Sequence, residues 1–476
     1  MITSSSSPVF ADNYRMKKNF FIIGLLAAII LVFPVFSVQA QTSTASTQAI
    51  LEQISRLLGG YNYDAAIALF DTISPDEAAS SPIRLLKASV LNSAGRTSEA
   101  RAIAEEIAAR EPNNIDALFV LSAVEAMSGR TTQQRTVLER ILSADPRNVY
   151  ALTDLGALHL QLRSFRNAEE YYDKVLEIDP SNLDALLGKA TIYRLNRDPH
   201  NAEAMLNQAV RYHPNNAAPY HERARLYNGA GFPINALDDL DKAKELNSFD
   251  YWIAFDRGST LLDLYRREQA LEEFERAVRI NPREFMGYVY TAGLKDELGD
   301  WDGAERDYEI LARLKPDYYF AFEGVGLHKM RRGQWAEARD AFLEVYRQAP
   351  NEYFYALLAA ANWMRADNVT GPRQFLNQAM ARVNRESIEY YMLRLYYDMT
   401  GRVYSGENDM IFRIDRETNL NVKAQMTFYF ALYHDIRGNL NSANVYYLQF
   451  KEMNRMYLVE WRLNEWILAN RGLLPY

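Results

Sequence analysis

The sequence predicts an all-α solenoid built from helix-turn-helix repeats, because three signals share one period of 34 residues. Proline recurs near the end of seven units, with Ser248 at a missing point of the same grid, and stops the second helix, since the residue before a proline is disfavoured in the α region. Small residues recur at the eighth and twentieth places, where they let paired helices approach closely. Glycine recurs at the fifteenth place, where the end of a first helix favours a left-handed residue. The prolines are Pro112, Pro146, Pro180, Pro214, Pro282, Pro316 and Pro350, and the glycines are Gly95, Gly129, Gly231, Gly299, Gly333 and Gly401.

The unit from Val149 to Asn182 shows this pattern most clearly. Its small residues are Gly156 and Ala168, Pro180 closes it, and apolar residues at helical spacing supply the faces that pack. A 34-residue helix-turn-helix period of this kind resembles the tetratricopeptide repeat (TPR). The resemblance implies a TPR-type α-solenoid, wound as a right-handed superhelix, whose first helices line a concave groove that holds other molecules.

Length and composition fit one elongated domain of this kind. A chain of 476 residues would ordinarily suggest about three globular domains, but a solenoid extends a single core by adding units. The net charge of −8, without a Lys/Arg-rich run, argues against nucleic acid as the main ligand. The absence of cysteine excludes disulfides, thiol nucleophiles and Cys-ligated metal clusters.

Residues 1–40 are expected to be a secretory signal peptide. Two lysines precede a run of 17 mostly apolar residues, and Val38 and Ala40 place small residues where a signal peptidase reads, so we expect cleavage after Ala40. Met16 is the more typical start, because it leaves a short basic n-region. The alternative is an uncleaved anchor, since the apolar run reaches the lower limit for spanning a bilayer. In either case we expect export to the periplasm or cell envelope of a bacterium, with membrane contact only through this segment if it is retained.

A linker at residues 41–46 precedes an expected TPR array of ten units over residues 47–386. After the first unit, the expected starts are Ser81, Ile115, Val149, Leu183, Ala217, Tyr251, Phe285, Tyr319 and Tyr353. Residues 387–476 are expected to hold degenerate TPR units, the last from Ala424, and a C-terminal capping helix from Glu452 to Asn470. Solenoids need atypical end units to cover the exposed core. The alternative for this Trp-bearing terminal helix is docking to a partner.

The sequence carries no motif for catalysis, cofactor binding or metal binding. No pair among the six histidines has the i, i+4 spacing of a helical metal site, and His159 and His434 occupy a place where other units carry tyrosine, which favours packing. The sequence has no G-x-S-x-G, P-loop or dinucleotide-binding fingerprint. Acidic pairs on the second helices are typical of solvated faces. We therefore expect a protein that is not an enzyme and needs no cofactor or metal.

The expected binding surface is the groove wall. In proteins that the array resembles, side chains at the second, fifth, ninth, twelfth and thirteenth places of first helices point into the groove. Here a basic and amide-bearing segment leads into an aromatic and Met-rich one, and such residues suit adaptable binding surfaces. The predicted partner-binding residues are Arg194, Arg225, Asn228, Trp252, Phe255, Phe320, Met330, Phe354 and Tyr391. Further groove positions are His221, Leu262, Leu327, Leu357, Met364 and Phe428, interrupted by Asp263, Asp296 and Glu297. The alternative for any single aromatic is packing against the adjacent helix.

Lys189, Arg223 and Arg257 form a second series, at the seventh place of three successive units. We expect a structural role, in which the stems pack and the charged heads pair with acidic residues of neighbouring helices. The alternative is that they enlarge the basic segment of the groove.

The predicted function is a non-enzymatic protein–protein interaction scaffold of the bacterial cell envelope, with a protein or peptide partner and no nucleic acid. The reason is that a long apolar patch on an open wall is a liability unless a ligand covers it. The alternative is a glycan-handling accessory in polysaccharide export or modification. It is suggested by the 31 tyrosines and 6 tryptophans, because aromatic faces stack on sugar rings.

Overall fold

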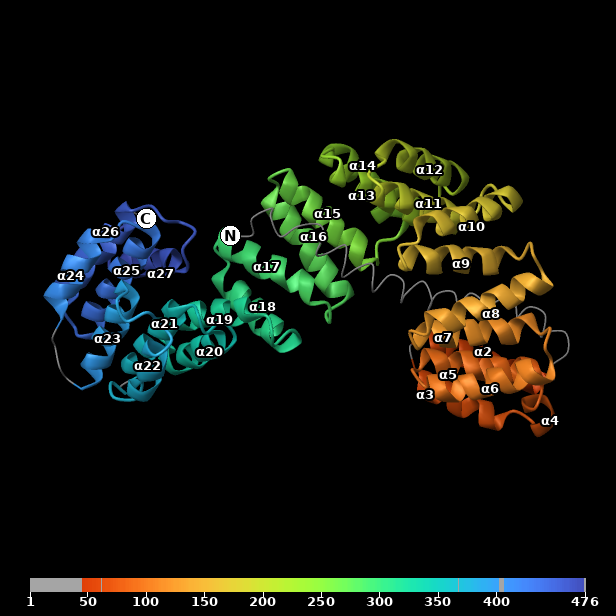
Figure 1. The fold of residues 1–476 in the computed structure, drawn as a ribbon, viewed down its shortest axis with the longest axis horizontal. Coiled ribbons are helices and arrows are strands. Elements are labelled where there is room, and N and C mark those ends of the chain that lie inside the picture. The colour runs from red at the N-terminus through yellow and green to blue at the C-terminus, as the bar shows by residue number, and fades with distance from the viewer. Residues whose placement is uncertain (1–44, 61, 367, 402–405, 475–476) are drawn as a thin grey trace. The chain divides into compact units, whose positions relative to one another are not determined.

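The computed structural model describes residues 45–60, 62–366, 368–401 and 406–474, over which all regular structure is helical (Figure 1). The chain divides into two compact units, which we call the N-terminal unit, ending at Asn247, and the C-terminal unit, beginning at Ser248. The predicted signal peptide and its cleavage site lie outside the described residues. None of the described helices combines the length and the hydropathy needed to cross a bilayer.

The helices of the N-terminal unit pair as the repeat predicts. Its first helices, which begin at five of the predicted unit starts, are α5 (Ser81–Ser93), α7 (Ile115–Met127), α9 (Val149–Gln161), α11 (Leu183–Leu195) and α13 (Ala217–Gly229). Its second helices are α6 (Thr97–Arg110), α8 (Thr131–Ala144), α10 (Phe165–Ile178), α12 (Pro199–Tyr212) and α14 (Pro233–Leu246). These are preceded by α2 (Ala45–Gly59), α3 (Tyr63–Leu69), a 3-10 helix η1 (Phe70–Thr72) and α4 (Pro75–Ala78). The second helix of the first repeat, residues 47–80, is therefore divided into short pieces. Helix α2 begins inside the predicted linker.

The C-terminal unit starts with the same regular pairs and then departs from them. Its regular pairs are α15 (Tyr251–Asp263) with α16 (Arg267–Ile280), α17 (Phe285–Leu298) with α18 (Trp301–Leu314), and α19 (Tyr319–Arg331) with α20 (Trp335–Gln348). The rest are α21 (Tyr353–Arg365), α22 (Arg373–Met380), α23 (Ile388–Thr400), α24 (Glu407–Arg416), α25 (Leu420–Ile436), α26 (Leu440–Glu452) and α27 (Val459–Asn470). Helix α25 begins before the predicted Ala424, and α27 begins at Val459 because α26 continues through Glu452.

Polar caps fix where most of the early first helices begin. The side chain of Asn148 accepts a hydrogen bond from the backbone N–H of Ala151 at 3.1 Å, which satisfies one of the unpaired donors at the start of α9. Asn114, Asn182, Asn216 and Asp250 do the same for α7, α11, α13 and α15. The corresponding side chains before α17, α19 and α21, which are Glu284, Tyr318 and Glu352, make no capping hydrogen bond.

Small residues at the eighth place make room for an aromatic ring on the second helix. The ring of Tyr172 on α10 lies between Gly156 on α9 and Gly188 on α11, and a Cβ at Gly156 would come within 2.6 Å of a ring carbon. The same relation joins Gly258 to Phe274 and Gly326 to Phe342. The small residues are therefore required where the repeat places them, but they make room for a ring rather than for a bare helix contact.

The turn between paired helices has a left-handed residue at the fifteenth place of the unit. Glycines there have positive φ, such as 80° at Gly231, but Arg163, Arg197 and Tyr265 hold φ of 56° to 60° without being glycine. The expectation for Gly401 was wrong, since its φ is −93°. The degenerate unit does not repeat the turn of the regular units at that position.

Candidate functional site

We call the surface formed by the second, fifth, ninth, twelfth and thirteenth places of the first helices the first-helix wall. In the N-terminal unit it carries Arg194 on α11 and Arg225 and Asn228 on α13, all half-buried. Arg225 pairs with Glu222 on the same helix, with Nη1 2.9 Å from Oε1. His221, a further predicted groove position, is buried. The wall is therefore polar here, and part of its positive charge is offset within the chain.

The cations at the seventh place make the ion pairs that were predicted for them. The nitrogen-to-oxygen distances are 2.5 Å for Lys189 with Asp173, 2.6 Å for Arg223 with Asp239 and 3.0 Å for Arg257 with Glu273. Each acidic partner lies on a neighbouring second helix. The structural role of this series is confirmed, and the pairs fix helices to one another rather than adding to the basic segment of the groove.

Two predicted partner-binding residues of the C-terminal unit are buried, so their assignment to the groove was wrong. Phe255 is 4% exposed, and its ring is covered by Phe274 and Tyr290, each with a centroid distance of 5.3 Å. Met330 is also 4% exposed, and its sulfur accepts a hydrogen bond from Asn362 on α21. The physical reason is that the second helix of the same repeat or the first helix of the next repeat covers these places. The same holds for the further positions Leu327, Leu357, Met364 and Phe428.

Phe320 and Phe354 belong to a group of rings that we call the aromatic strip, in which Phe320 is exposed, Tyr355 is buried and the other rings are half-buried. Phe320 is 47% exposed and stacks on Tyr319 with centroids 4.1 Å apart. The ring centroid of Tyr355 lies 6.3 Å from that of Tyr319 and 4.3 Å from that of Phe354. The strip consists of Phe285, Tyr318, Tyr319, Phe320, Tyr353, Phe354 and Tyr355, at the starts of α17, α19 and α21. The structure thus brings together rings from three successive first helices.

The remaining predicted aromatics are half-buried and lie apart from the strip. The Tyr391 ring on α23 is covered by the guanidinium of Arg413 on α24, with Cζ 3.4 Å from its centroid. Trp252 on α15 lies edge-on to Tyr251, with centroids 5.0 Å apart. Each keeps part of its surface open, so their predicted role in binding stays a prediction.

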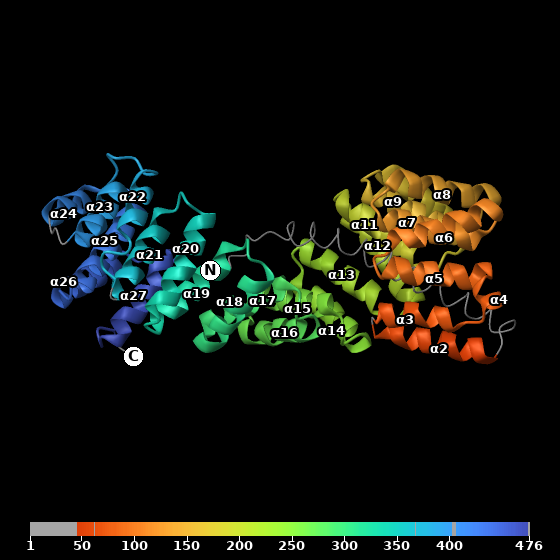
Figure 2. The same cartoon turned by 90° about the horizontal axis from the view of Figure 1, so that it is seen from below.

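Helix α27 covers part of the first-helix wall of the C-terminal unit. It contacts α19, α25 and α26, and lies beside α25 in Figure 1 and beside α19 in Figure 2. Arg462 of α27 forms an ion pair with Asp296 at the twelfth place of α17, 166 residues earlier. Trp466 packs on His328 of α19 and on Trp301, with centroid distances of 5.5 and 6.0 Å. No local pattern in the sequence predicts this contact, because pairings over such a separation leave no periodic signal.

Asp296 is the centre of a buried polar network on this wall. Its carboxylate lies 2.8 Å from Nε2 of His328 and accepts a hydrogen bond from the Tyr308 hydroxyl at 3.0 Å. Burial would raise the pKa of Asp296, but the hydrogen bond and charge of His328 and the charge of Arg462 hold it below its usual value. Asp296 therefore stays ionised, so that it is a fixed negative charge under α27.

Two further carboxyl groups lie where α19 and α27 meet, and Glu460 is fully buried while Glu323 is half-buried. Glu460 of α27 accepts hydrogen bonds from Tyr429 at 2.8 Å and from Gln425 at 3.1 Å, and Glu323 of α19 accepts one from Tyr355. Burial raises the pKa of both carboxyl groups, and their mutual repulsion adds to the effect at Glu323, although these hydrogen bonds oppose it. Their environment therefore favours the protonated forms.

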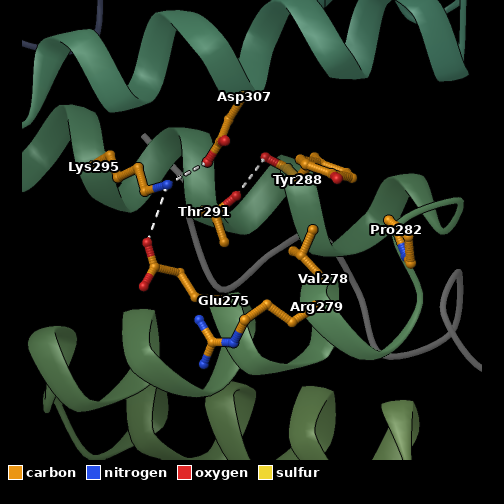
Figure 3. Close-up of a pocket in the computed structure, with 8 residues that line it drawn as sticks. All are labelled: Glu275, Val278, Arg279, Pro282, Tyr288, Thr291, Lys295 and Asp307. Carbon is orange, nitrogen blue, oxygen red and sulfur yellow. Dashed lines mark hydrogen bonds and ion pairs between the residues drawn. The ribbon is translucent and has the colours of Figure 1, made fainter.

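A cavity of about 360 Å³ lies between α16, α17 and α18 (Figure 3). Lys295 points into it, with its Nζ 2.8 Å from Asp307 and 3.1 Å from Glu275. Burial alone would lower the pKa of Lys295, but Asp307 and Glu275 raise it, so the amine stays charged and paired. The lining residues are Glu275, Val278, Arg279, Pro282, Tyr288, Thr291, Lys295 and Asp307. The cavity thus lies between two neighbouring repeats. The charge of Lys295 in it is neutralised by Asp307 and Glu275.

The histidines that were expected to pack do so. His159 and His434 are buried and stack on Tyr171 and Tyr446, with centroids 5.5 and 5.8 Å apart. Burial lowers the pKa of both histidines. Over the part of the chain that the structure describes, no group of three or more His, Asp or Glu side chains could hold a metal ion.

The chain is similar to several solved structures. A tetratricopeptide repeat protein from Parabacteroides merdae ATCC 43184 is 20% identical over 52% of this chain and 98% of its own, with a TM-score of 0.42. The pilF protein of Pseudomonas aeruginosa is 21% identical over 43% of this chain and 95% of its own, with a TM-score of 0.39. YrrB, described as a TPR protein with an unusual peptide-binding site, is 20% identical over 39% of this chain and 95% of its own, with a TM-score of 0.32.

Models of the tetratricopeptide repeat family match several parts of the sequence. One matches residues 159–227, and a second matches residues 85–149, 128–182 and 293–353. These segments contain helix pairs that repeat every 34 residues, with small residues such as Gly156 and Gly326 facing aromatic rings. The matched repeats and the all-α architecture agree, and the chain is a tetratricopeptide repeat protein.

Proposed function

We propose that this protein is a non-enzymatic scaffold of a bacterial cell envelope, which binds a protein or peptide partner on its first-helix wall. The TPR fold supports a protein–protein interaction scaffold, since proteins of this kind are generally non-catalytic. The proposed location rests on the lysines, apolar run and small residues of the predicted signal peptide at residues 1–40. The proposed contact surface rests on the aromatic strip.

The aromatic strip is the main support for the proposed contact surface. Binding energy at protein interfaces concentrates in a few aromatic and Arg side chains. Phe320 offers nearly half of its surface to solvent, and Tyr319 holds its ring in place by stacking. A ring that is already fixed loses little conformational entropy on binding. The strip therefore offers a rigid apolar surface across three first helices.

The test is partner capture from the native envelope by the full chain and by its Phe320→Ala and Phe354→Ala variants. Each variant should weaken binding by about 1 to 3 kcal/mol, as truncation of an interface aromatic does, while far-UV circular dichroism stays that of the folded chain. Phe412→Ala is the matched control, because Phe412 is an exposed phenylalanine on α24 outside the strip. Equal capture by all four proteins would refute the strip as the contact surface. Binding to a glycan array that depends on Phe320 would favour the glycan-handling alternative.

The proposed location has a separate test. N-terminal sequencing of the protein from envelope fractions should give Gln41 as the first residue. Recovery of an intact chain beginning at Met16 in the membrane fraction would replace cleavage with the anchor alternative. Recovery from the cytoplasm alone would refute export.

A further inference from the structure

We propose that the face formed by Asp296, Trp301, His328 and Arg331 is a receptor for a partner helix that carries Arg and Trp four residues apart, and that α27 occupies this receptor in cis. The inference rests on the proposed function, because it states which chemistry a partner would bring to the C-terminal unit.

The two groups that α27 brings to this face lie on one side of the helix. Arg462 and Trp466 are spaced i, i+4, so their side chains are neighbours. Arg462 pairs with Asp296, whose side chain is 1% exposed. Trp466 fills the space beside His328 and Trp301. One charged and one aromatic anchor on one helix face are the features by which a groove recognises an amphipathic helix.

The receptor residues are held by contacts that do not involve α27. His328 and Tyr308 position the carboxylate of Asp296. The guanidinium of Arg331 lies 4.9 Å from the ring of Trp301 and pairs with Asp302 at 3.2 Å. The acidic and aromatic subsites are therefore formed by α17, α18 and α19 themselves. A preorganised site of this kind can bind a helix without being rebuilt.

The other side of α27 fits its surroundings less well. Asn464 is 0% exposed, and neither its side-chain oxygen nor its nitrogen has a hydrogen-bond partner in the structure. A buried polar group without a partner opposes burial. A helix that kept Arg, Trp and Glu but carried an apolar residue at the position of Asn464 would therefore displace α27.

The connection between α26 and α27 permits such an exchange. It consists of residues 453–458, in which Asn454 has a φ of 51° and Met456 and Tyr457 are exposed. Helices α25 and α26 pack on each other through Phe428 and Phe450, with centroids 5.5 Å apart. The α25–α26 pair thus has a contact of its own that does not depend on α27.

The first experiment measures binding of a labelled peptide with the sequence of residues 457–474 to the full chain by fluorescence anisotropy. Release of α27 by the double substitution Arg462→Ala and Trp466→Ala should tighten peptide binding at least 10-fold relative to the unchanged chain. Adding Asp296→Asn to the released chain should reverse most of that gain. Glu465→Gln is the control, because Glu465 pairs with Lys451 on α26 and not with the receptor. A folded, released chain that binds the peptide no better than the unchanged chain would overturn the proposal.

A second measurement needs no variant of the protein, so it does not depend on how the released chain folds. The unchanged chain is mixed with excess peptide in which Leu replaces the residue equivalent to Asn464. Hydrogen exchange at the amides of residues 459–470 should accelerate at least 10-fold as α27 leaves the receptor. Unchanged exchange at saturating peptide would overturn the proposal. Capture of the native partner through Phe320 is measured without the peptide, so failure here leaves the proposed function standing.

Discussion

The two units share one repeat but differ in the range of the contacts that hold them. In the N-terminal unit, α7, α9, α11 and α13 begin at their own Asn caps, and buried clusters such as the one around Leu206 join neighbouring repeats. In the C-terminal unit, one buried cluster extends from Leu327 to Leu468, and Arg365 pairs with Asp435, 70 residues away. A regular repeat is therefore stable through nearest neighbours, whereas the degenerate repeats gain their stability from distant contacts.

The largest expected effect tests this difference directly. Phe428→Ala removes a fully buried ring from the extended cluster and should lower the free energy of unfolding by about 3 to 5 kcal/mol. Leu206→Ala in the N-terminal unit should cost about 2 to 5 kcal/mol. Urea denaturation measures both changes. Hydrogen exchange should show that the first substitution exposes α19 to α27 together and the second only α11 to α13. If hydrogen exchange accelerated over equally many helices in both variants, the two units would not differ in the range of their contacts.

The second effect concerns a carboxyl group in the N-terminal unit. Burial raises the pKa of Asp154 to about 7, and the charge of Asp184 adds to this. The folded state then keeps a proton that the unfolded state has lost, so stability is greatest below about pH 4, falls as the pH rises to about 7 and is constant above. Asp154→Asn should remove this dependence and stabilise the unit at pH 8 by about 1 to 2 kcal/mol, because partial contact with water reduces the full effect. Urea titrations at pH 5 and pH 8 measure the free energy of unfolding. If Asp154→Asn leaves the difference between the two pH values unchanged, this assignment is contradicted.

Capping provides a smaller effect with opposite signs in the two units. Asn148→Ala should destabilise the N-terminal unit by about 1 kcal/mol, because it removes the cap of α9. Glu352→Asn should stabilise the C-terminal unit by about 0.5 to 1 kcal/mol, because α21 lacks a side-chain cap. Thermal unfolding of the two variants should therefore shift in opposite directions. Equal signs would mean that the caps do not distinguish the units.

The smallest effect comes from the strained turns. Tyr265 holds a left-handed backbone at a place where other units carry glycine. Tyr265→Gly should stabilise the fold by about 0.5 kcal/mol, because relief of strain exceeds the added entropy of the unfolded chain. Arg163→Gly should act alike in the N-terminal unit, since its φ is similar. A lower melting temperature in both variants would show that the contacts of these side chains stabilise the fold more than the backbone strain destabilises it.

The regular fold could be predicted because its determinants are local. Caps, prolines and small residues act within one 34-residue period, so the first helices from Ser81 to Tyr353 begin where predicted. The candidate site was predicted less well. A place in the repeat indicates which side chains face the wall but not which neighbour covers them, and Phe255 and Met330 are covered. The pair of Asp296 and Arg462 depends on the path of the whole C-terminal unit, which no local pattern encodes.

The ring of Tyr172 limits how this array can change in length during evolution or design. Deleting one repeat, Leu183 to Asn216, would preserve the 34-residue period, the caps and the repeat position of every remaining residue. It would also bring Glu222 to the place that Gly188 occupies, against a ring that leaves no room for a Cβ. Units of this protein are therefore not interchangeable modules, and a shortened array needs a matching change of Tyr172 to a smaller side chain.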